Sequence, residues 1–217
     1  MLSIVCTPIG NLKDITLRAI ETLQSVDMIA CEDTRHTKIL LDQYNIKTPT
    51  TSFFQHNRFT KADVLLKLMQ EGKNVALVSD AGTPGILDPG YNLINLAITH
   101  AIPIVFIPGP TAFVHALVVS GKPAHQFYFQ GFLPPRSQAR RNRLEALKKL
   151  ECTVIFYESC HRIVSTLEDL QVVCPDKEVV CARELTKKFE EVVRGTPAML
   201  LAHFAQNRPR GEFVLLF

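Results

Sequence analysis

Glycines, prolines and carboxylates are concentrated in residues 79–90, which read SDAGTPGILDPG. The segment follows an apolar run that is typical of a short buried strand. Gly82 and Gly85 lack a Cβ atom and let the backbone approach a ligand closely, and Asp80 and Asp88 add two carboxylates beside them. Ligands of open α/β sheets bind at the carboxyl ends of strands. The segment therefore predicts a small-molecule site, with an elaborate strand-to-helix turn as the alternative.

Two more loops also connect a predicted strand to a predicted helix. Residues 7–12 (TPIGNL) and 108–112 (PGPTA) each follow a predicted strand and precede a predicted helix. A helix N-terminus offers free N–H groups and the positive end of a dipole, which favour an anion. The glycine pattern of a dinucleotide fold and the P-loop pattern are both missing from the chain. Each loop alone is compatible with an ordinary connection, but three loops at the carboxyl ends of adjacent parallel strands predict one ligand pocket.

Charged side chains follow a further predicted strand in residues 31–37 (CEDTRHT). Asp33 is a good helix N-cap. Arg35 and His36 fall in the first helical turn, where the helix dipole disfavours positive charge, so a functional role is expected for this segment. Residues 55–58 (QHNR) show a weaker form of the same pattern, for which a solvated turn is an equal alternative.

Two segments of the second half also end predicted strands with charged residues. They are residues 157–162 (YESCHR) and 182–187 (ARELTK). We expect Glu158, Arg183 and Glu184 to face a cleft between the two halves of the chain. Cys160 and His161 are sequence neighbours, which seldom face one another, so a catalytic dyad is not expected there.

A strongly basic helix is predicted over residues 138–150. At helical spacing Arg136, Arg140 and Arg143 share one face, while Leu144 and Leu147 supply the packing side. A solvated helix usually mixes the two signs of charge, but the only acid here is Glu145. Binding of a phosphate backbone is therefore the favoured interpretation. Its candidate residues are Arg136, Arg140, Arg141, Arg143, Lys148 and Lys149.

Composition indicates a folded globular chain without a membrane segment. The chain has 217 residues, of which 47% are hydrophobic, and a net charge of +3. No apolar run approaches the roughly 20 residues that span a bilayer, and no signal peptide is visible, so the cytoplasm is expected.

The six cysteines are scattered without zinc-ligand spacing. We expect reduced thiols and no metal site.

Short apolar runs alternate with helical patterns along the whole chain. In the first half, strands are expected at 2–6, 28–31, 75–78 and 102–107, and helices at 16–24, 33–44, 60–71 and 91–100, the third opened by a capping box of Thr60 and Asp63. In the second half, helices are expected at 111–120, 138–150, 163–173 and from Pro197, and strands at 127–132, 154–157, 179–182 and 213–217.

This alternation predicts an α/β fold of two domains, residues 1–109 and 110–217, with mostly parallel or mixed sheets flanked by helices. The chain ends inside its last apolar run. We therefore expect a C-terminal extension to be missing, with a naturally short protein as the alternative.

Several motifs together resemble a known family. TPIGNLKDITLRA, CEDTRHT, LVSDAGTPGILDPG, PGPTA, GFLPP with the basic helix, FYESCHR, ARELTK and RGEF occur in this order over residues 1–216. They resemble the 16S ribosomal RNA cytidine 2′-O-methyltransferases, a branch of the tetrapyrrole methylase superfamily. The resemblance departs at Cys160, where the family has proline, and at Leu87, where it has serine.

The resemblance implies a two-domain methyltransferase, usually a homodimer, that binds S-adenosylmethionine in an inter-domain cleft and needs no metal. The implied substrate is a cytidine ribose in the decoding region of the small ribosomal subunit. Implied cofactor contacts are Pro8, Asp80, Thr83, Thr111, Ala112, Phe156, Ala182 and Gly211. For the chemistry we expect Glu32, Arg35, Arg183 and Glu184, with Glu32 or Glu184 accepting the hydroxyl proton and the arginines holding flanking phosphates.

Two rival functions stay open at this point. A small-molecule methylase of the precorrin type shares the implied fold, but it has no need of a basic helix. A non-catalytic ribosome-binding factor with an inherited pocket is the other alternative, and the crowded glycine-rich and acidic loops argue against it.

Overall fold

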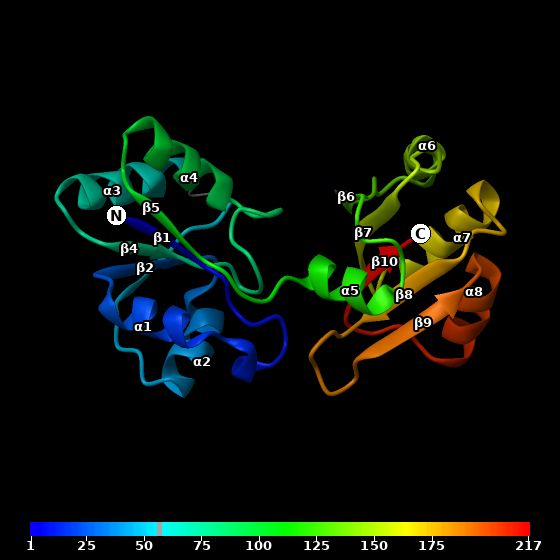
Figure 1. Cartoon of the computed structure of the whole chain (residues 1–217), viewed down its shortest axis with the longest axis horizontal. Coiled ribbons are helices and arrows are strands. Elements are labelled where there is room, and N and C mark those ends of the chain that lie inside the picture. The colour runs from blue at the N-terminus through cyan, green and yellow to red at the C-terminus, as the bar shows by residue number, and fades with distance from the viewer. Residues whose placement is uncertain (56–57) are drawn as a thin grey trace. The chain divides into compact units, whose positions relative to one another are not determined.

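Two compact units make up the chain. The computed structural model describes residues 1–55 and 58–217 and divides into unit 1, Met1–Thr111, and unit 2, Ala112–Phe217 (Figure 1). The division falls two residues after the boundary predicted at 109 and 110. His56 and Asn57, which belong to the weaker polar segment of the sequence analysis, lie outside the described residues.

The sheet of unit 1 consists of five parallel strands in the order β3-β2-β4-β1-β5. They are β1 (Leu2–Val5), β2 (Met28–Cys31), β3 (Thr50–Ser52), β4 (Val75–Leu77) and β5 (Ile104–Ile107). In register, Leu2 of β1 lies opposite Val75 of β4 and Ile104 of β5. Since β4, β1 and β5 are neighbours and parallel, the loops that follow them leave the same edge of the sheet.

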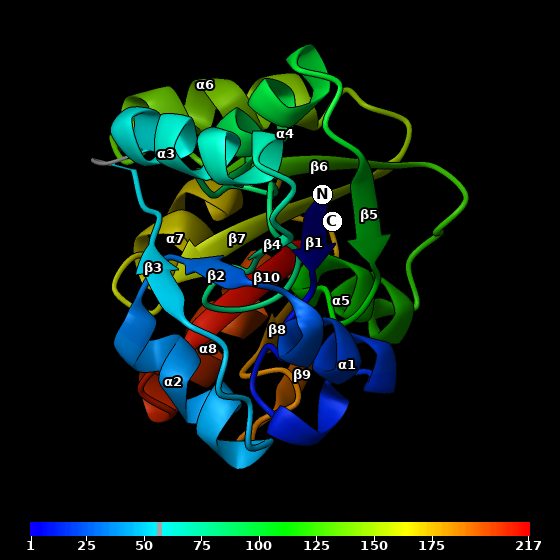
Figure 2. The ribbon, with the colours of Figure 1, turned by 90° about the vertical axis from the view of Figure 1, so that its left-hand side faces the viewer.

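Helices cover both faces of this sheet (Figure 2). One face carries α1 (Leu17–Ser25) and α2 (Thr34–Gln43), which pack Leu23 and Leu40 against strand residues such as Ile29. The other carries α3 (Arg58–Gln70) and α4 (Gly90–Thr99), where Leu65 and Leu93 pack against the alternate strand residues. This alternation of side chains between two apolar layers explains why the strands read as continuous apolar runs. A short 3₁₀ helix, η1 (Leu12–Asp14), follows β1.

The predicted N-cap at Asp33 is present, and Thr196 caps a second helix. The Asp33 side chain accepts from the backbone N–H of Arg35 at the start of α2, and Thr196 accepts from that of Met199. The predicted capping box at Thr60 and Asp63 is wrong. Because α3 begins at Arg58, Thr60 lies inside the helix and does not occupy its N-cap.

The sheet of unit 2 is mixed, in the order β6-β7-β10-β8-β9. Its strands are β6 (Phe127–Phe132), β7 (Thr153–Ser159), β8 (Val179–Arg183), β9 (Glu191–Gly195) and β10 (Glu212–Leu216). Strand β6 runs parallel to β7, whereas the pairs β7–β10, β10–β8 and β8–β9 are antiparallel. The fold class of two α/β units with one parallel and one mixed sheet is confirmed.

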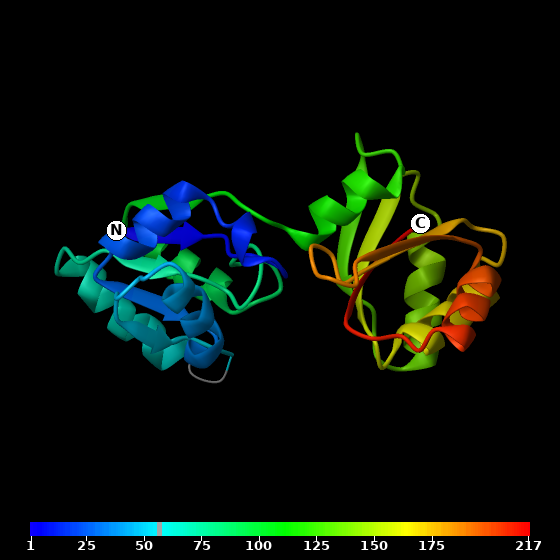
Figure 3. The ribbon, with the colours of Figure 1, turned by 90° about the horizontal axis from the view of Figure 1, so that it is seen from below.

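Helices α5 to α8 flank this second sheet (Figure 3). Three of them, α6 (Ser137–Leu147), α7 (Ile163–Val173) and α8 (Pro197–Gln206), bury Leu144, Leu170 and Leu200 in one core. Helix α5 (Ala112–Ser120) packs against β7, β8 and β10 with Ala116 and Leu117 buried.

Two further features of the fold concern the length of its apolar helices and the state of its cysteines. Within residues 1–55 and 58–217, no helix is both long and apolar enough to cross a membrane. The six cysteines are all free thiols, and Cys6, Cys31, Cys174 and Cys181 are buried. Burial raises the pKa of the Cys181 thiol above its ordinary value, so this side chain acts as a small hydrophobe.

Candidate functional site

The loops that follow β1 and β4 are joined by backbone hydrogen bonds. The N–H of Thr7 donates to the carbonyl of Gly82 at 2.9 Å, and the N–H of Gly82 donates back to Thr7 at 3.0 Å. The Thr7 hydroxyl also donates to the carbonyl of Ser79 at 3.1 Å. Gly82 has a φ of +83°, which glycine adopts without strain. Pro8, a predicted cofactor contact, is buried next to this junction.

The loop after β5 joins the same group. The Thr83 hydroxyl lies 2.7 Å from that of Thr111 and 3.3 Å from the Cys6 sulfur. A Cβ on Gly109 would lie 2.9 Å from the Cβ of Cys6, so glycine allows these two segments to approach each other. The prediction that the three loops lie together at one edge of the sheet is confirmed.

Glu32 and Asp80 bring carboxylates to this edge. Asp80 accepts from the backbone N–H of Asp33 at 3.0 Å, which links the β4 loop to the start of α2. Burial raises the pKa of Glu32 above its ordinary value, and the negative charges of Asp88 and Asp80 raise it further. A carboxylate with a raised pKa is a stronger proton acceptor, which is the property of a general base.

Asp88 shapes the glycine-rich loop from inside. Its carboxylate accepts from the backbone N–H of Gly85 at 2.8 and 2.9 Å and from that of Gly90 at 2.7 Å. Burial raises the pKa of Asp88, and the two backbone donors oppose that change. Between these anchors Leu87 adopts a φ of +65°. The loop is therefore a hydrogen-bonded structure with a fixed backbone path.

Arg35 lies at the surface of this region. Its side chain is 89% exposed and forms a two-point ion pair with Asp33, at 2.7 Å from Nη2 and 3.1 Å from Nε. The hydrogen bonds from Arg35 hold the pKa of Asp33 well below its ordinary value. The N-cap carboxylate therefore compensates the positive charge of Arg35 in the first turn, which the helix dipole disfavours.

In unit 2, Arg183 and Glu184 lie at the end of β8, and the side chains of both already bind other residues of this unit. Arg183 Nε lies 2.5 Å from Glu191 Oε2. Glu184 accepts from Lys187 Nζ at 2.9 Å and from the N–H of Glu212 at 3.1 Å. Burial alone would raise the pKa of Glu184, but these two hydrogen bonds outweigh it and lower the pKa. Glu184 is thus a weaker proton acceptor than Glu32.

The other predicted cofactor contacts of unit 2 differ in accessibility. Gly211 has a φ of +81°, and a Cβ there would overlap the carboxylate of Glu184. Ala112 is half-buried at the first turn of α5. Phe156 and Ala182 are fully buried on β7 and β8, backbone included.

Glu158 does not face a cleft, and that prediction is wrong. Its side chain is buried and accepts from the Thr166 hydroxyl at 2.7 Å and from the N–H of Ser159 at 2.9 Å. It also pairs with Arg162 at 3.3 Å. Arg162 in turn donates to the carbonyls of Leu133 and Pro134, so the pair braces the loop before α6.

The basic helix α6 is less exposed than its sequence indicates. Arg140 is 3% exposed and pairs with the buried Asp169 of α7 at 2.6 Å. The prediction that Arg140 shares an exposed face with Arg136 and Arg143 is therefore wrong. Arg141 also pairs with Asp169, at 2.6 Å, and keeps 40% of its side chain exposed.

The remaining cations of this segment reach solvent to different degrees. Arg143 donates to Gln130 at 2.7 Å and to the Tyr128 hydroxyl at 2.8 Å. Lys148 is exposed but donates to the carbonyl of Val173 at 2.9 Å and pairs with Glu145. Arg136 and Lys149 are exposed. The candidate RNA surface of α6 is thus Arg136, Arg143, Lys148 and Lys149, with Arg141 at its edge.

Sequence reasoning missed the side chains that join the loops. Cys6 and Thr7 contact residues up to 77 positions away along the chain, and no local pattern signals such contacts. Within the described parts of the chain, no group of three or more His, Cys, Asp or Glu side chains is placed to hold a metal ion.

Comparison with known proteins places this architecture in a family. A family model described as tetrapyrrole (corrin/porphyrin) methylases matches residues 1–200. The chain belongs to the tetrapyrrole methylase family and, within it, to the group of proteins named ribosomal RNA small subunit methyltransferase I. The second assignment depends on relatives of high identity, and it confirms the resemblance seen in the motifs.

The relative from Vibrio cholerae is 51% identical over 220 residues, covering 100% of this chain and 76% of its own. The one from Synechocystis sp. is 48% identical over 217 residues, covering 100% of this chain and 78% of its own. The one from Thermotoga maritima is 46% identical over 215 residues, covering 99% of this chain and 96% of its own. All three are named ribosomal RNA small subunit methyltransferase I.

Solved structures agree on the fold. A diphthine synthase has a TM-score of 0.79 at 15% identity, over 99% of this chain and 88% of its own. A cobalt-precorrin-4 methyltransferase of cobalamin biosynthesis has a TM-score of 0.75 at 19% identity, over 99% of this chain and 93% of its own. At these identities the likeness establishes the fold alone.

Proposed function

We propose that this protein is an S-adenosylmethionine-dependent methyltransferase of 16S ribosomal RNA that modifies the 2′-hydroxyl of a cytidine in the decoding region of the small ribosomal subunit. The observation that carries the proposal is the identity of about half of all positions, over the whole chain, to relatives named ribosomal RNA small subunit methyltransferase I. A homodimer and a cytoplasmic location are parts of the same proposal.

The residues at the edge of the first sheet fit the proposed cofactor. Gly82 and Gly109 bring backbone segments close together, and Asp80 offers a carboxylate that can accept from an amino group or a ribose hydroxyl. Pro8, Asp80, Thr83 and Thr111 of this edge are the proposed contacts, with Ala112, Phe156, Ala182 and Gly211 in unit 2. When bound, S-adenosylmethionine supplies an electrophilic methyl group, which the ribose 2′-oxygen takes up.

Glu32 is the proposed proton acceptor. It withdraws the proton of the 2′-hydroxyl as the oxygen becomes a nucleophile, a step worth about 10²–10⁴-fold in rate. The raised pKa of Glu32 and the lowered pKa of Glu184 favour Glu32 for this role. Arg35, which is exposed, and Arg183 are proposed to hold the flanking phosphates, and Arg183 would have to leave Glu191 to do so.

Methylation of the isolated small subunit tests the proposal. We would incubate the protein with labelled S-adenosylmethionine and small subunits from cells that lack the modification, then digest the RNA to nucleosides. The expected product is 2′-O-methylcytidine. Label in another nucleoside would contradict the cytidine assignment. Stoichiometric cofactor binding without RNA methylation would favour the small-molecule methylase, and no cofactor binding would favour the ribosome-binding factor.

Gly90→Ala is expected to weaken cofactor binding by at least about tenfold. The added Cβ would lie 2.7 Å from the Asp88 carboxylate and 2.9 Å from the N of Gly85, so the loop would have to shift. Isothermal titration with S-adenosylmethionine measures the loss. Gly72→Ala is the matched control, because it strains a φ of +86° in the same unit with no atom within 4 Å. Equal affinities of the two variants would contradict a role for the loop.

Arg136→Ala and Lys149→Ala are each expected to weaken RNA binding and to reduce its salt dependence by the equivalent of about one phosphate contact. The measurement is the affinity for small subunits over a series of salt concentrations. Arg18→Ala, at an exposed position on α1, is the control. A salt dependence that stays at the wild-type slope in both variants would exclude Arg136 and Lys149 from the RNA surface.

A further inference from the structure

The connection between β8 and β9 has an unusual backbone. Glu184 and Thr186 are not glycines but have φ values of +50° and +65°. A positive φ is costly for any side chain and is a true outlier for a β-branched residue such as threonine. The Thr186 hydroxyl oxygen is also buried and finds no hydrogen-bond partner among the described residues. Such strain persists only where the surroundings enforce it.

Hydrogen bonds within the connection enforce this path. The N–H of Lys187 donates to the carbonyl of Glu184 at 2.9 Å, and the N–H of Glu190 donates to that of Lys187 at 3.1 Å. The N–H of Thr186 donates to the Glu190 carboxylate at 2.5 Å. The connection is therefore a compact turn with a defined tip at Lys188 and Phe189.

The acids of the turn are all engaged internally. Glu184 accepts from Lys187 and the N–H of Glu212, and Glu190 accepts from the N–H of Thr186. Glu191 pairs with Arg183 at 2.5 Å and lies 3.1 Å from His203 Nε2. Lys187 and Arg183 balance the charges of Glu184 and Glu191, and the N–H of Thr186 holds the Glu190 carboxylate within the turn.

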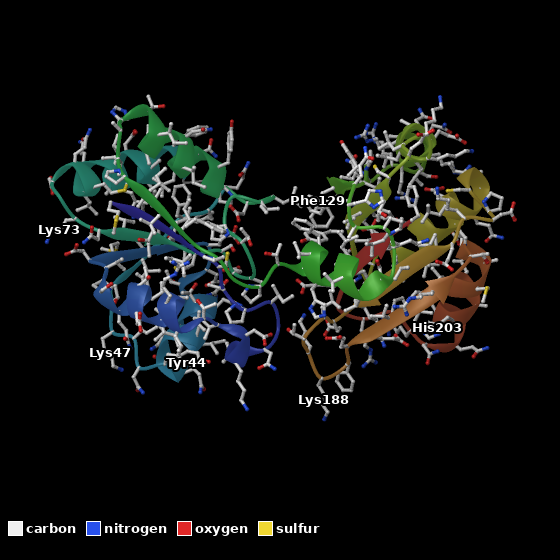
Figure 4. The ribbon with its side chains drawn as sticks, viewed as in Figure 1. Tyr44, Lys47, Lys73, Phe129, Lys188 and His203 are labelled. Carbon is white, nitrogen blue, oxygen red and sulfur yellow. The ribbon has the colours of Figure 1, made fainter. Side chains whose placement is uncertain are left out.

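The tip presents a cation and an aromatic ring outward. Phe189 is 67% exposed, and Lys188 Nζ lies 5.6 Å from the centre of its ring. Figure 4 shows Lys188 at the outer end of the turn, pointing away from unit 2. Over the described ranges 1–55 and 58–217, no carboxylate lies within ion-pair distance of Lys188. The tip thus combines an exposed ring with an uncompensated positive charge.

We propose that Lys188 and Phe189 form a contact for an unpaired nucleotide of the RNA substrate, with the base stacked on Phe189 and the neighbouring phosphate paired with Lys188. This inference rests on the proposed function and adds a binding element to it. Single-stranded RNA is recognised by stacking of bases on exposed aromatic rings and by cations that follow the backbone. A hydrophobic protein partner would not require an outward charge beside the ring.

The test uses the full chain and substitutions at the tip. Stacking on one aromatic side chain changes affinity by about 5- to 160-fold. We expect Phe189→Ala to weaken binding of a fluorescent oligocytidylate, and to raise KM for small subunits, within this range. Phe189→Trp is expected to retain binding and Phe189→Leu to lose it, because leucine keeps apolar bulk without a π face. Lys188→Ala is expected to reduce the salt dependence.

Controls separate this inference from its alternatives. Phe59→Ala removes a ring of similar exposure, 66%, from α3. The inference is overturned if Phe189→Ala binds like the wild type, if Phe59→Ala weakens binding equally, or if Phe189→Leu binds as well as Phe189→Trp. A fall in melting temperature for Phe189→Ala would also overturn it, because the ring would then pack within the chain. Absence of RNA methylation by the wild type would instead refute the proposed function, and oligonucleotide binding would still test the tip.

Discussion

Replacing Glu32 by glutamine is expected to lower methyl transfer to small subunits by about 10²–10⁴-fold, the range for loss of a general base. Glutamine keeps the size and most hydrogen bonds of glutamate but cannot accept the hydroxyl proton. Cofactor affinity is expected to stay within about threefold, since the loss lies in a step after binding. Single-turnover rates with saturating RNA and S-adenosylmethionine measure the effect. Glu21→Gln, at an exposed position on α1, is the control.

The pH dependence provides an independent check on Glu32. Burial and the charges of Asp88 and Asp80 raise the pKa of its carboxyl, and a base acts only in the deprotonated form. Activity is therefore expected to be full above this raised pKa and to fall tenfold per pH unit below it. Glu32→Gln should abolish this acid limb. An unchanged limb in the variant would assign it to another group, and near-normal turnover would exclude Glu32 as the base.

Replacing Arg140 by alanine is expected to destabilise the protein by up to about 3–5 kcal/mol, because the buried Asp169 would lose its one buried cation and keep only Arg141 and Ser137. Burial alone would raise the pKa of Asp169, but hydrogen bonds from Arg141 and Ser137 and the pairing with Arg140 outweigh it and lower the pKa. The pair therefore stabilises the fold above the ordinary pKa of aspartate, and this contribution is lost as the pH falls through the lowered value.

Chemical unfolding at neutral pH, followed by circular dichroism, measures this loss. Arg136→Ala is the matched control on the same segment, because an exposed substitution usually changes stability by less than about 0.5 kcal/mol. Arg140→Ala is expected to lower stability and leave the RNA contacts in place. Arg136→Ala is expected to weaken RNA binding and leave stability unchanged, since Arg136 is proposed to bind RNA and Arg140 is not. An Arg140→Ala protein of normal stability and weakened RNA binding would show that this arginine is available to RNA.

The strand-end loops could be predicted from the sequence because glycines, prolines and carboxylates are concentrated directly after apolar runs. The alternation of strands and helices requires parallel pairing in unit 1, which brings the loops after β1, β4 and β5 to one edge. Strands β3 and β9 were missed. Strand β3 has three residues, all polar, and β9 carries Glu191 and Arg194 among its apolar residues, so neither forms a continuous apolar run.

The functions of Arg140 and Glu158 were not predictable from local patterns. Helical spacing shows which arginines share a face, but it does not show which face a neighbouring helix covers. Asp169, which decides the position of Arg140, is 29 residues away on α7. Glu158 likewise lies near the end of a strand, as a site residue would. Its partners are Arg162 in the turn that follows and Thr166 in the next helix. The position of Arg140 thus depends on packing between helices, and that of Glu158 on how the following turn folds back on β7.

The hydrogen bonds that join Thr7 to Gly82 and Thr83 to Thr111 have a consequence for synthesis of the chain. Thr7 of the first loop bonds to Gly82 and to Ser79, the latter 72 positions away, and Thr83 bonds to Thr111, 28 positions away. Contacts of such long range form slowly, because closing the long loop between the two segments costs chain entropy. During translation, this edge of unit 1 cannot assemble until Thr111 has emerged from the ribosome. Each new copy therefore acquires its proposed cofactor site only after a complete domain has been made.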